Sequence, residues 1–403
     1  MTVIETFDPA FLADPYPTYA AIRETTPVHE VHPGFFRLVG YEDAALVFKH
    51  PNASADRGGS DFGDADERLL TAARTVDRHL DTWMLMRDPP DHTRLRSLVA
   101  KAFTPRVVER LRGGVEAIVA ELLADAGPGV ELDLIATLAY PLPTRVIAEL
   151  IGLPVEDADD FKRWSNDIAA IIGNAALAPN RDELYDRADD SIRAVSAYMQ
   201  ELIAARRSDP REDLLTGLIA AEEAGSHLSS DELIGTTVML LFAGHETTTN
   251  LIGNGTLALL AHPHELRRLR DDPDLLPIAI EELLRYDSPV QATGRSLTGP
   301  VELPDGTVLP TGAALGIWIG GANRDPAVFD DPDRLDVGRR GARHLSFAHG
   351  PHYCIGAALA RLEAEVAFGH LLWRLPEFEL AGETPWRRNP ILRGVERLPI
   401  RFG

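Results

Sequence analysis

The 403-residue sequence contains a single cysteine, Cys354, and this count restricts how the chain can be held together. One thiol cannot form an intramolecular disulfide, and it cannot build a cysteine-rich zinc site. Hydrophobic residues make up 45% of the chain, which is enough for a sizeable core. A chain of this length can form one large domain or two ordinary ones.

The residues around Cys354 indicate a task for its sulfur. The local sequence is Phe347-Ala348-His349-Gly350-Pro351-His352-Tyr353-Cys354-Ile355-Gly356. A thiolate can be the one protein ligand of a haem iron, where it pushes electron density toward the metal and favours O–O cleavage. Gly350 and Gly356 have no Cβ, so the backbone can turn sharply and lie close to a flat macrocycle. The helix-forming residues 357–363 place Cys354 just before a helix N-terminus, where the helix dipole favours a thiolate.

A lone cysteine is more often a small buried hydrophobic residue, but this decapeptide matches Phe-x-x-Gly-x-x-x-Cys-x-Gly, four residue types at fixed spacing. It resembles the haem-binding loop of the cytochrome P-450 (haem-thiolate monooxygenase) superfamily, and the resemblance extends from about residue 10 to the C-terminus. It implies a mainly α-helical single domain over residues 1–403 with a small β region. Haem b then lies between the long central helix and the cysteine-loop helix. Cys354 is the implied iron ligand, and Phe347, Gly350 and Gly356 shape the loop.

Charge and hydropathy exclude several classes of partner. The formal net charge is −22, so non-specific binding to nucleic acid or to an anionic membrane is not expected. Residues 1–8 have neither a basic region nor an apolar core, so we expect no signal peptide. No run of about 18 apolar residues occurs, so we expect no membrane-spanning helix. The scarcity of cysteine fits a reducing cytosol, and we expect a cytoplasmic protein.

The coarse pattern is mostly helical. Strand-like runs at 28–31 and 35–39 flank His32-Pro33-Gly34 and predict a hairpin. Helical patterns dominate from about residue 92 to 286. The stretch 323–343 is rich in Asp, Pro and Arg without periodicity, which predicts an irregular segment. Further short strand-like runs cover 301–303, 313–317 and 398–402.

The longest helical segment carries a second candidate site, Ala243-Gly244-His245-Glu246-Thr247-Thr248. Ser229-x-x-Glu232 is a capping box that can start this helix, and Pro263 bounds its far end. Glycine inside a helix costs up to about 1 kcal/mol relative to alanine, and threonine is also a weak helix former. A local bulge or kink, with threonine bonded to the preceding turn, would explain both. Such an opening leaves room for dioxygen and water, and an acid–alcohol pair there can relay protons.

This segment matches the oxygen-activation motif of the resembled family, Ala-Gly-x-Glu-Thr-Thr. The resemblance implies that Ala243 and Gly244 lie against the haem and that Glu246 and Thr247 are the catalytic pair. It gives His245 a structural role, because the family varies there. Without the cysteine loop, a helix-packing glycine followed by solvent-facing polar residues would be the better interpretation.

A third candidate is Glu282-Leu283-Leu284-Arg285. An acid–base pair three residues apart is usually a surface helix pair, and others in this chain share the spacing. By position, Glu282 and Arg285 resemble the buried Glu-x-x-Arg pair of the family, and Arg334 resembles the arginine that completes its network. Leu335 stands where the family usually has Phe. The implied role is structural, namely to lock the loop that presents Cys354.

Haem propionates need cations or hydrogen-bond donors. Residues 91–96 follow two prolines and should open a helix, on which His92 and Arg96 share one face. They match the His-x-x-x-Arg propionate pair of the family, and Arg295 and His352 match two further propionate partners. Charge-assisted hydrogen bonds from these four groups would hold both carboxylates. Each group taken alone is more often a solvated surface residue.

The substrate pocket is expected to be mostly apolar. The resemblance implies that one polar residue, Gln291, joins its lining, although a wall position turned to solvent is an equal alternative. Residues of about 55–84 and 168–190 are polar and irregular, as a mobile lid would be. The implied apolar lining consists of Met239, Phe242, Ala243, Val290, Ala292, Ile391 and Leu392.

Electrons must come from a separate protein, because the sequence carries no flavin region and one cysteine cannot ligate an iron–sulfur cluster. Basic residues near the thiolate could dock an acidic ferredoxin, which a ferredoxin reductase would reduce, although ordinary surface arginines are an equal alternative. By resemblance these residues are Arg106, Arg110, Arg112, Arg343 and Arg361.

The sequence therefore predicts a haem-dependent monooxygenase that inserts one atom of O2 into a C–H or C=C bond. Its expected substrate is a mainly apolar small molecule, a natural product of polyketide, macrolide or terpene type. Two alternatives stay open: oxidative coupling or desaturation on the same haem scaffold, and a haem-free recruitment module. A peroxide-driven enzyme fits less well, because such family members lack the acid–alcohol pair.

Overall fold

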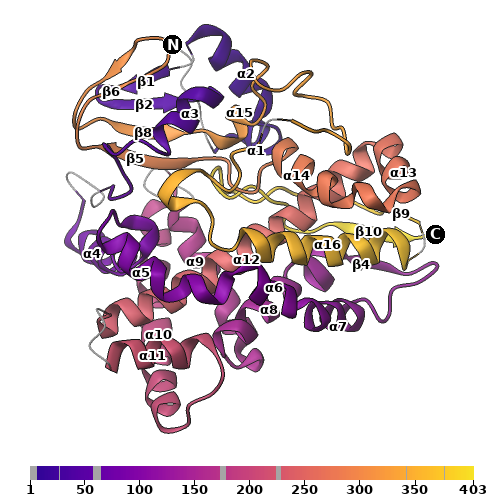
Figure 1. The fold of residues 1–403 in the computed structure, drawn as a ribbon, viewed down its shortest axis with the longest axis horizontal. Coiled ribbons are helices and arrows are strands. Elements are labelled where there is room, and N and C mark those ends of the chain that lie inside the picture. The colour runs from indigo at the N-terminus through magenta and orange to yellow at the C-terminus, as the bar shows by residue number, and fades with distance from the viewer. Residues whose placement is uncertain are drawn as a thin grey trace. The chain divides into compact units, whose positions relative to one another are not determined.

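A computed structural model describes residues 7–26, 28–57, 65–172, 178–223, 228–341, 343–375 and 377–403. The chain divides into two compact units. Unit 1 comprises residues 1–54, 108–143 and 247–403, and unit 2 comprises 55–107 and 144–246. Figure 1 follows the chain through both units, which are described separately below.

Unit 1 contains a five-stranded sheet in the order β1-β2-β8-β5-β3, as far as the structure describes the chain. β1 and β2 form the predicted hairpin, and Gly34 makes its turn with φ +81°. β2 pairs in parallel with β8, and Phe36 lies opposite Leu315. This pairing joins the N-terminal hairpin to a strand that comes almost 300 residues later in the sequence. The strands are β1 (Val28–His32), β2 (Phe35–Leu38), β3 (Ala53–Ser54), β5 (Thr293–Leu297) and β8 (Ala314–Ile317).

Two smaller sheets complete the β region of unit 1. β10 (Pro399–Phe402) lies between β4 (Glu131–Asp133) and β9 (Phe378–Leu380), and β6 (Val301–Glu302) pairs with β7 (Val308–Leu309). The strands predicted at 301–303, 313–317 and 398–402 are confirmed. β3, β4, β5, β7 and β9 were not predicted, because runs of two to five residues carry too little alternation to stand out.

The helices of unit 1 frame these sheets. α16 follows the cysteine loop and packs against α7 and α14. Residues 323–341 contain no helix or strand, so the irregular segment is confirmed over its described part. The helices are α1 (Pro9–Ala13), α2 (Tyr16–Thr25), α3 (Tyr41–Val47), α7 (Arg112–Leu122), α13 (Pro263–Asp271), α14 (Leu276–Tyr286), α15 (Ile319–Ala322) and α16 (Ala357–Trp373), with a π-helical turn at Ile135–Ala139.

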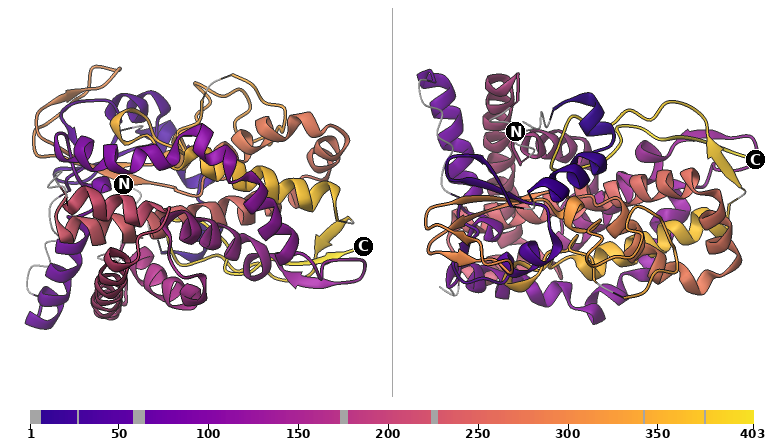
Figure 2. Two further views of the ribbon diagram at one scale, coloured as in Figure 1. Left: turned by 60° about the horizontal axis from the view of Figure 1, so that its bottom comes forward. Right: turned by 90° about the horizontal axis from the view of Figure 1, so that it is seen from above.

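The described part of unit 2 is helical. The long helix α10 packs against α9 and α4, as Figure 1 and Figure 2 show. The helix predicted to open after two prolines is α5, which begins at Asp91. The helices are α4 (Glu67–Leu80), α5 (Asp91–Val99), α8 (Pro141–Ile151, which starts in unit 1), α9 (Ala158–Ile172), α10 (Arg181–Ser208) and α11 (Leu214–Glu223), and α6 (Pro105–Arg110) leads into unit 1.

The longest helix, α12 (Ser230–Ala261), contributes residues to both units. Its predicted capping box is confirmed: the Ser229 backbone N–H donates to Glu232 Oε2 at 2.8 Å, and the Glu232 N–H donates to Ser229 Oγ at 3.2 Å. Pro263 opens the next helix. The α-helix is assigned without interruption through residues 243–248, so the predicted bulge is wrong.

Gly244 has a packing reason in place of that bulge. A β-carbon at Gly244 would lie 2.6 Å from Ile147 Cγ1 of α8, so only glycine lets the two helices approach this closely. Close approach therefore accounts for a weak helix former inside a buried helix.

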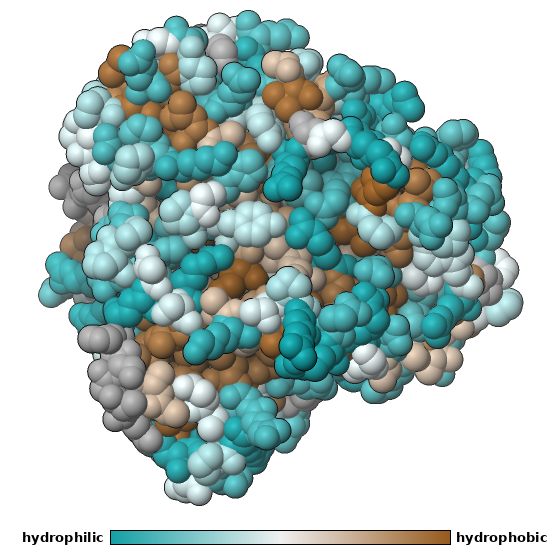
Figure 3. All heavy atoms as spheres, in the orientation of Figure 1, coloured by the Kyte–Doolittle hydropathy of each residue, from teal (hydrophilic) through white to brown (hydrophobic). Residues whose placement is uncertain are grey.

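The described helices include none that is long and apolar enough to cross a bilayer. Hydrophilic side chains dominate the face drawn in Figure 3, with hydrophobic ones in smaller patches between them. This surface fits the large net negative charge of the chain.

One almost fully buried carboxyl group of unit 1 is Glu363. Glu363 lies on α16 with 1% of its surface exposed. Burial raises the pKa of Glu363 well above its usual range. A hydrogen bond with the Thr248 side chain lowers this pKa by a smaller amount. The folded protein therefore holds this side chain as a neutral acid.

We predict that Glu363→Gln stabilises the protein at alkaline pH. The unfolded carboxyl loses its proton above a pH of about 4, whereas the folded one keeps it, so wild-type stability falls by about 1.4 kcal/mol per pH unit until the folded group ionises. Glutamine mimics the neutral acid and removes this fall. Urea unfolding at pH 5 and pH 8 should show the variant gaining stability on wild type between the two pH values, by about 1 kcal/mol or more.

The matched control is Glu379→Gln, whose side chain is 74% exposed. Its stability difference from wild type should stay constant over the same range. A constant difference for Glu363→Gln as well would mean that Glu363 is ionised in the folded protein.

Candidate active site

The loop that carries Cys354 is fixed by its own backbone. The Cys354 N–H donates to the Phe347 carbonyl at 2.9 Å, and the Tyr353 N–H donates to the Gly350 carbonyl at 3.0 Å. Gly350 has φ +71°, and a β-carbon there would lie 2.5 Å from the Phe48 carbonyl oxygen. Only glycine satisfies both conditions. α16 begins at Ala357 with Gly356 as its N-cap, as predicted, and Cys354 is half-buried and in no disulfide.

Arg361 ties this loop to α14. Its guanidinium stacks over the Phe347 ring at 4.5 Å, and its Nε donates to Glu281 Oε1 at 2.6 Å. His344 Nε2 lies 3.2 Å from the other oxygen of Glu281. Burial alone would raise the pKa of Glu281, but the hydrogen bonds from Arg361 and His344 outweigh it and lower that pKa to about 2. Sequence reasoning missed Glu281, which differs from its neighbour Glu282 by no local signal.

Asn323 is a second anchor that the sequence did not indicate. It has no exposed surface, and its Nδ2 donates to Ser288 Oγ and Ser346 Oγ, each at 2.8 Å. Its Oδ1 accepts from the Leu345 N–H at 2.6 Å. One buried amide therefore connects the residues after α14 to the start of the cysteine loop.

The Glu-x-x-Arg pair is buried as predicted. Arg285 Nε donates to Glu282 Oε2 at 2.7 Å, and the two side chains are 2% and 1% exposed. The third member is Arg339, whose Nε lies 3.1 Å from Glu282 Oε1. The prediction of Arg334 is wrong: its side chain is 59% exposed and reaches only Asp336, at 3.8 Å. The backbone carbonyl of Arg334 does join the network, because Arg285 Nη2 donates to it at 3.2 Å.

α12 presents one open face of small side chains. From Leu233 to Thr256, a stretch that the structure describes throughout, every residue is buried except Ala243, Gly244 and Thr247. These positions lie on one side of the helix. Glu246 is 2% exposed. His245 Nδ1 lies 2.8 Å from the Leu241 carbonyl, which agrees with the structural role expected for it.

The predicted propionate partners lie in both units. In unit 1, Arg295 on β5 is 5% exposed and stacks over the Phe48 ring at 5.6 Å. Phe48 is also the residue that Gly350 approaches, so Arg295 and the cysteine loop share a neighbour. His352 lies within the loop, in a 3-10 turn at Gly350–His352. In unit 2, α5 buries His92 and leaves Arg96 half-buried on the same face.

These residues fit a haem. A cysteine thiolate on a hydrogen-bonded loop can ligate the iron. The open face of α12 can lie against a flat ring, since its side chains are small. Arginine and histidine side chains at partly or fully buried positions can bind carboxylates.

Comparison with known proteins agrees with this geometry. The family model for cytochrome P-450 matches residues 25–390.

The chain belongs to the cytochrome P-450 family.

It is 44% identical to cytochrome P-450 107B1 of Saccharopolyspora erythraea over 98% of this chain and 97% of that protein. It is 37% identical to the polyketide biosynthesis cytochrome P-450 PksS of Bacillus subtilis, over 97% and 96% of the two chains. Among solved structures, it resembles P450BioI in complex with a hexadec-9Z-enoic acid ligated acyl carrier protein. That comparison has a TM-score of 0.88 at 34% identity and covers 98% of this chain and 100% of the other. The protein is thus an oxidoreductase that incorporates oxygen, with a haem-iron cofactor, a small-molecule substrate and O2.

In this P-450, two of the segments predicted to line the substrate pocket lie together. Val290 forms an antiparallel bridge with Leu392, and the Gln291 N–H donates to the Ile391 carbonyl at 2.7 Å. Ala292 is buried in a cluster against which Ile391 packs. In unit 2, Met239 and Phe242 are buried on α12, and the Phe242 ring lies 5.6 Å from that of Trp83. Sequence reasoning missed Trp83, because one aromatic residue before a 3-10 turn carries no motif.

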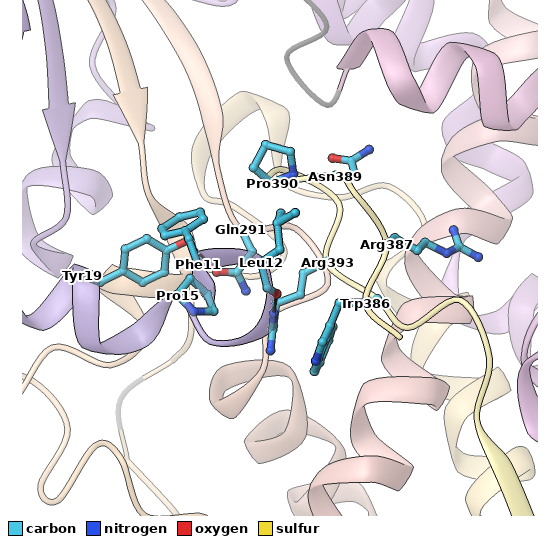
Figure 4. A pocket seen from close by; sticks show the side chains of 11 residues that line it. Phe11, Leu12, Pro15, Tyr19, Gln291, Trp386, Arg387, Asn389, Pro390 and Arg393 are labelled. Atoms are coloured by element: carbon cyan, nitrogen blue, oxygen red, sulfur yellow. Dashed lines mark hydrogen bonds between the residues drawn. The ribbon is translucent and has the colours of Figure 1, made fainter. Parts of the chain in front are cut away.

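Gln291 does not offer its amide to a substrate. Its Nε2 donates to the Ser288 carbonyl at 2.8 Å and to Tyr16 Oη at 3.1 Å, and its Oε1 accepts from Tyr19 at 3.0 Å. It borders a pocket of about 10 Å³, enough for one water molecule. Figure 4 shows this pocket, with Gln291 between Tyr19 and Arg393. The predicted substrate contact is replaced by a satisfied network.

The prediction that the lid segments are irregular is wrong for most of their described residues. Residues 67–80 and 181–190 are helical, in α4 and α10. α4 does show a helical pattern of buried residues, at Leu69, Ala72, Ala73 and Val76. The prediction missed this pattern because the segment is polar in composition. Residues 58–64 and 173–177, also part of that prediction, lie outside the described residues.

We predict that Arg339→Gln destabilises the protein and that Arg334→Gln does not. Loss of Arg339 removes one partner of the buried Glu282 carboxylate and three hydrogen bonds to backbone carbonyls. Denaturant unfolding should show a loss of about 1–3 kcal/mol for Arg339→Gln. For Arg334→Gln the change should stay within about 0.5 kcal/mol, because its backbone carbonyl remains. Equal losses would restore Arg334 to the network.

Proposed function

We propose that this protein is a haem b-dependent monooxygenase that inserts one atom of O2 into a C–H or C=C bond of a mainly apolar natural product. The two compact units act as one catalytic domain. The observation that carries the proposal is the Cys354 loop, which matches Phe-x-x-Gly-x-x-x-Cys-x-Gly and whose backbone is fixed by Gly350 against Phe48. When bound, the haem supplies activation of dioxygen at its iron. Cys354 would hold the iron, and His92, Arg96, Arg295 and His352 would hold the propionates.

Glu246 and Thr247 are proposed to relay protons. They are successive residues of α12, and the Thr247 side chain belongs to the open face while Glu246 is almost fully buried. A hydroxyl on that face can hold and pass on a proton, and it can receive another from a nearby acid. Ala243 and Gly244 leave space beside it, because neither has a side chain longer than a methyl group.

The proposed substrate class rests on the pocket lining and on relatives. Four apolar residues favour an apolar substrate body: Ala292 and Leu392, which are buried, and Val290 and Ile391, which are half-buried. The name of the Bacillus subtilis relative refers to polyketide biosynthesis. We therefore place polyketides and macrolides ahead of terpenes as candidate substrates.

A separate ferredoxin and its reductase are proposed as electron donors. Arg106, Arg110 and Arg343 are exposed and have no ion pair among the residues that the structure describes, so they can meet an acidic partner. Arg361 and Arg112 are less suited. Arg361 is bound to Glu281, and Arg112 pairs with Glu109 at 2.6 Å and Glu365 at 3.1 Å.

The experiment is a turnover assay of the purified haem protein with a macrolide and polyketide panel, a surrogate ferredoxin with its reductase, and isotopically labelled dioxygen. A product heavier by one labelled oxygen atom supports the proposal. A product that lacks hydrogen and carries no added oxygen would indicate coupling or desaturation. A protein that takes up no haem but binds a carrier-linked substrate would indicate a recruitment module.

We predict that Thr247→Ala uncouples reductant consumption from product formation. The variant lacks the hydroxyl that delivers protons on the open face of α12, so product formed per reductant consumed should fall by about tenfold or more. Peroxide release should rise in the same reaction. Thr256→Ala is the matched control, because the Thr256 hydroxyl bonds only to the Ile252 carbonyl of the same helix, at 2.8 Å. Unchanged coupling in Thr247→Ala would exclude the proposed role.

A further inference from the structure

Arg37 is the exception among the buried arginines. Six arginines of the described residues are buried, and five of them donate to a carboxylate or to a carbonyl. Arg37 is 6% exposed, and its Nε and Nη1 have no hydrogen-bond acceptor in the part of the chain that the structure describes. The paired ones are Arg206 (to Asp213 and Gly152), Arg285 (to Glu282), Arg295 (to Gly294), Arg324 (to Tyr286) and Arg393 (to Asp287).

An unpaired guanidinium cannot escape its burial by losing its proton. Burial lowers the pKa of Arg37, but a guanidinium remains charged at any physiological pH. A buried charge without a counter-ion costs free energy, so a native fold that keeps one usually pairs it with something else. Tyr19 is the one titratable neighbour whose charge acts on Arg37 among the described residues, and it is neutral near pH 7 because burial raises its pKa well above 10.

The described strands of the sheet bring no acceptor side chain to Nε and Nη1 of this guanidinium. Arg37 on β2 faces Gly316 on β8, and Gly316 faces Gly294 on β5, so these three positions form one row on one face. The space over Gly316 is occupied by Phe35 and Trp318, whose nearest atoms lie 3.2 Å and 3.5 Å from where a β-carbon would stand. Neither glycine has a side chain to cover the guanidinium. Arg37 instead stacks over the ring of Trp318, 5.0 Å from its centroid. A cation over an aromatic face is stabilised, but the ring supplies no acceptor for the Nε and Nη1 N–H groups, which have no partner among the described residues.

Trp318 connects Arg37 to the proposed substrate pocket. It belongs to a buried apolar cluster, called here the Trp318 cluster, which also contains Ala292 and against which Ile391 packs. Ala292 and Ile391 are two of the residues proposed to line that pocket. Two more members, Phe11 and Tyr19, stand beside Gln291 in Figure 4. The remaining members are Tyr16, Ile22 and Val39.

We propose that Arg37 binds the carboxylate of an acidic, amphipathic substrate whose apolar body lies along the Trp318 cluster. The proposal rests on the proposed monooxygenase function and narrows its substrate class. The planar fork of a guanidinium matches a carboxylate in bidentate geometry. A phosphate carries nearly two negative charges near neutral pH and is a poorer match for one guanidinium in apolar surroundings.

The test compares decanoate with decanol, which has the same chain and no charge, by titration calorimetry on the full-length haem-loaded protein. Wild type should bind decanoate about tenfold or more tightly than decanol, since the charge-assisted pair forms only with the acid. Arg37→Met should lose this preference and leave decanol binding within about twofold. Arg37→Lys should keep part of it. The haem spectrum of the same samples reports separately on the proposed function, so the two hypotheses fail independently.

Thermal unfolding supplies a second readout that needs no ligand. Arg37→Met removes an unpaired buried charge and should unfold at the same temperature as wild type or higher. Arg206→Met removes a paired buried arginine and should unfold lower. A lower unfolding temperature for Arg37→Met, with decanoate and decanol weakened equally, would make Arg37 a packing residue. Equal affinity of wild type for the two ligands would also overturn the proposal.

Discussion

A single thiol must be presented on a short loop without a disulfide or a metal cluster to hold that loop still. The structure meets this constraint by close packing at one point: the Gly350 backbone lies so near the Phe48 carbonyl that no side chain fits between them. The loop is then secured from three directions. Arg361 stacks on Phe347 and pairs with Glu281, Asn323 holds the loop entry, and α16 starts directly beyond Gly356.

Buried polar groups in unit 1 are of two kinds: those whose hydrogen bonds are satisfied within the fold, and those that have no hydrogen-bond partner among the described residues. Glu282, Arg285 and Arg339 form a closed network whose donors also satisfy the carbonyls of an irregular segment without secondary structure of its own. Gln291 closes a similar network with Tyr16 and Tyr19. Arg37 is different, because the same core that satisfies other arginines gives it an aromatic face and no acceptor among the described residues. A satisfied group stabilises the fold, whereas a buried cation without an acceptor keeps N–H donors that a ligand can use.

The sequence predicted the chemistry better than the packing. The cysteine loop, the capping box of α12, the N-terminal hairpin and the buried Glu282–Arg285 pair depend on residue types at fixed local spacing, and each of these features is present. Arg339 could not be chosen over Arg334, because four arginines stand between 334 and 343 and only the path of the loop selects one. Gly244 suggested a bulge, since sequence alone does not show that Ile147, almost 100 residues earlier, packs there. Two further neighbours are also distant in the sequence: Tyr19 for the Gln291 amide, and Gly316, which lies opposite Arg37 in the sheet.

The central claim is that the Cys354 thiolate ligates haem iron. The most direct measurement is the absorption spectrum of the purified protein after reduction with dithionite and exposure to carbon monoxide. This account predicts a strongly red-shifted Soret band in the wild type, and loss of that shift with retention of haem in Cys354→His. A Soret band at its unshifted position in freshly prepared wild-type protein, or no haem band after expression with added haem, would contradict it.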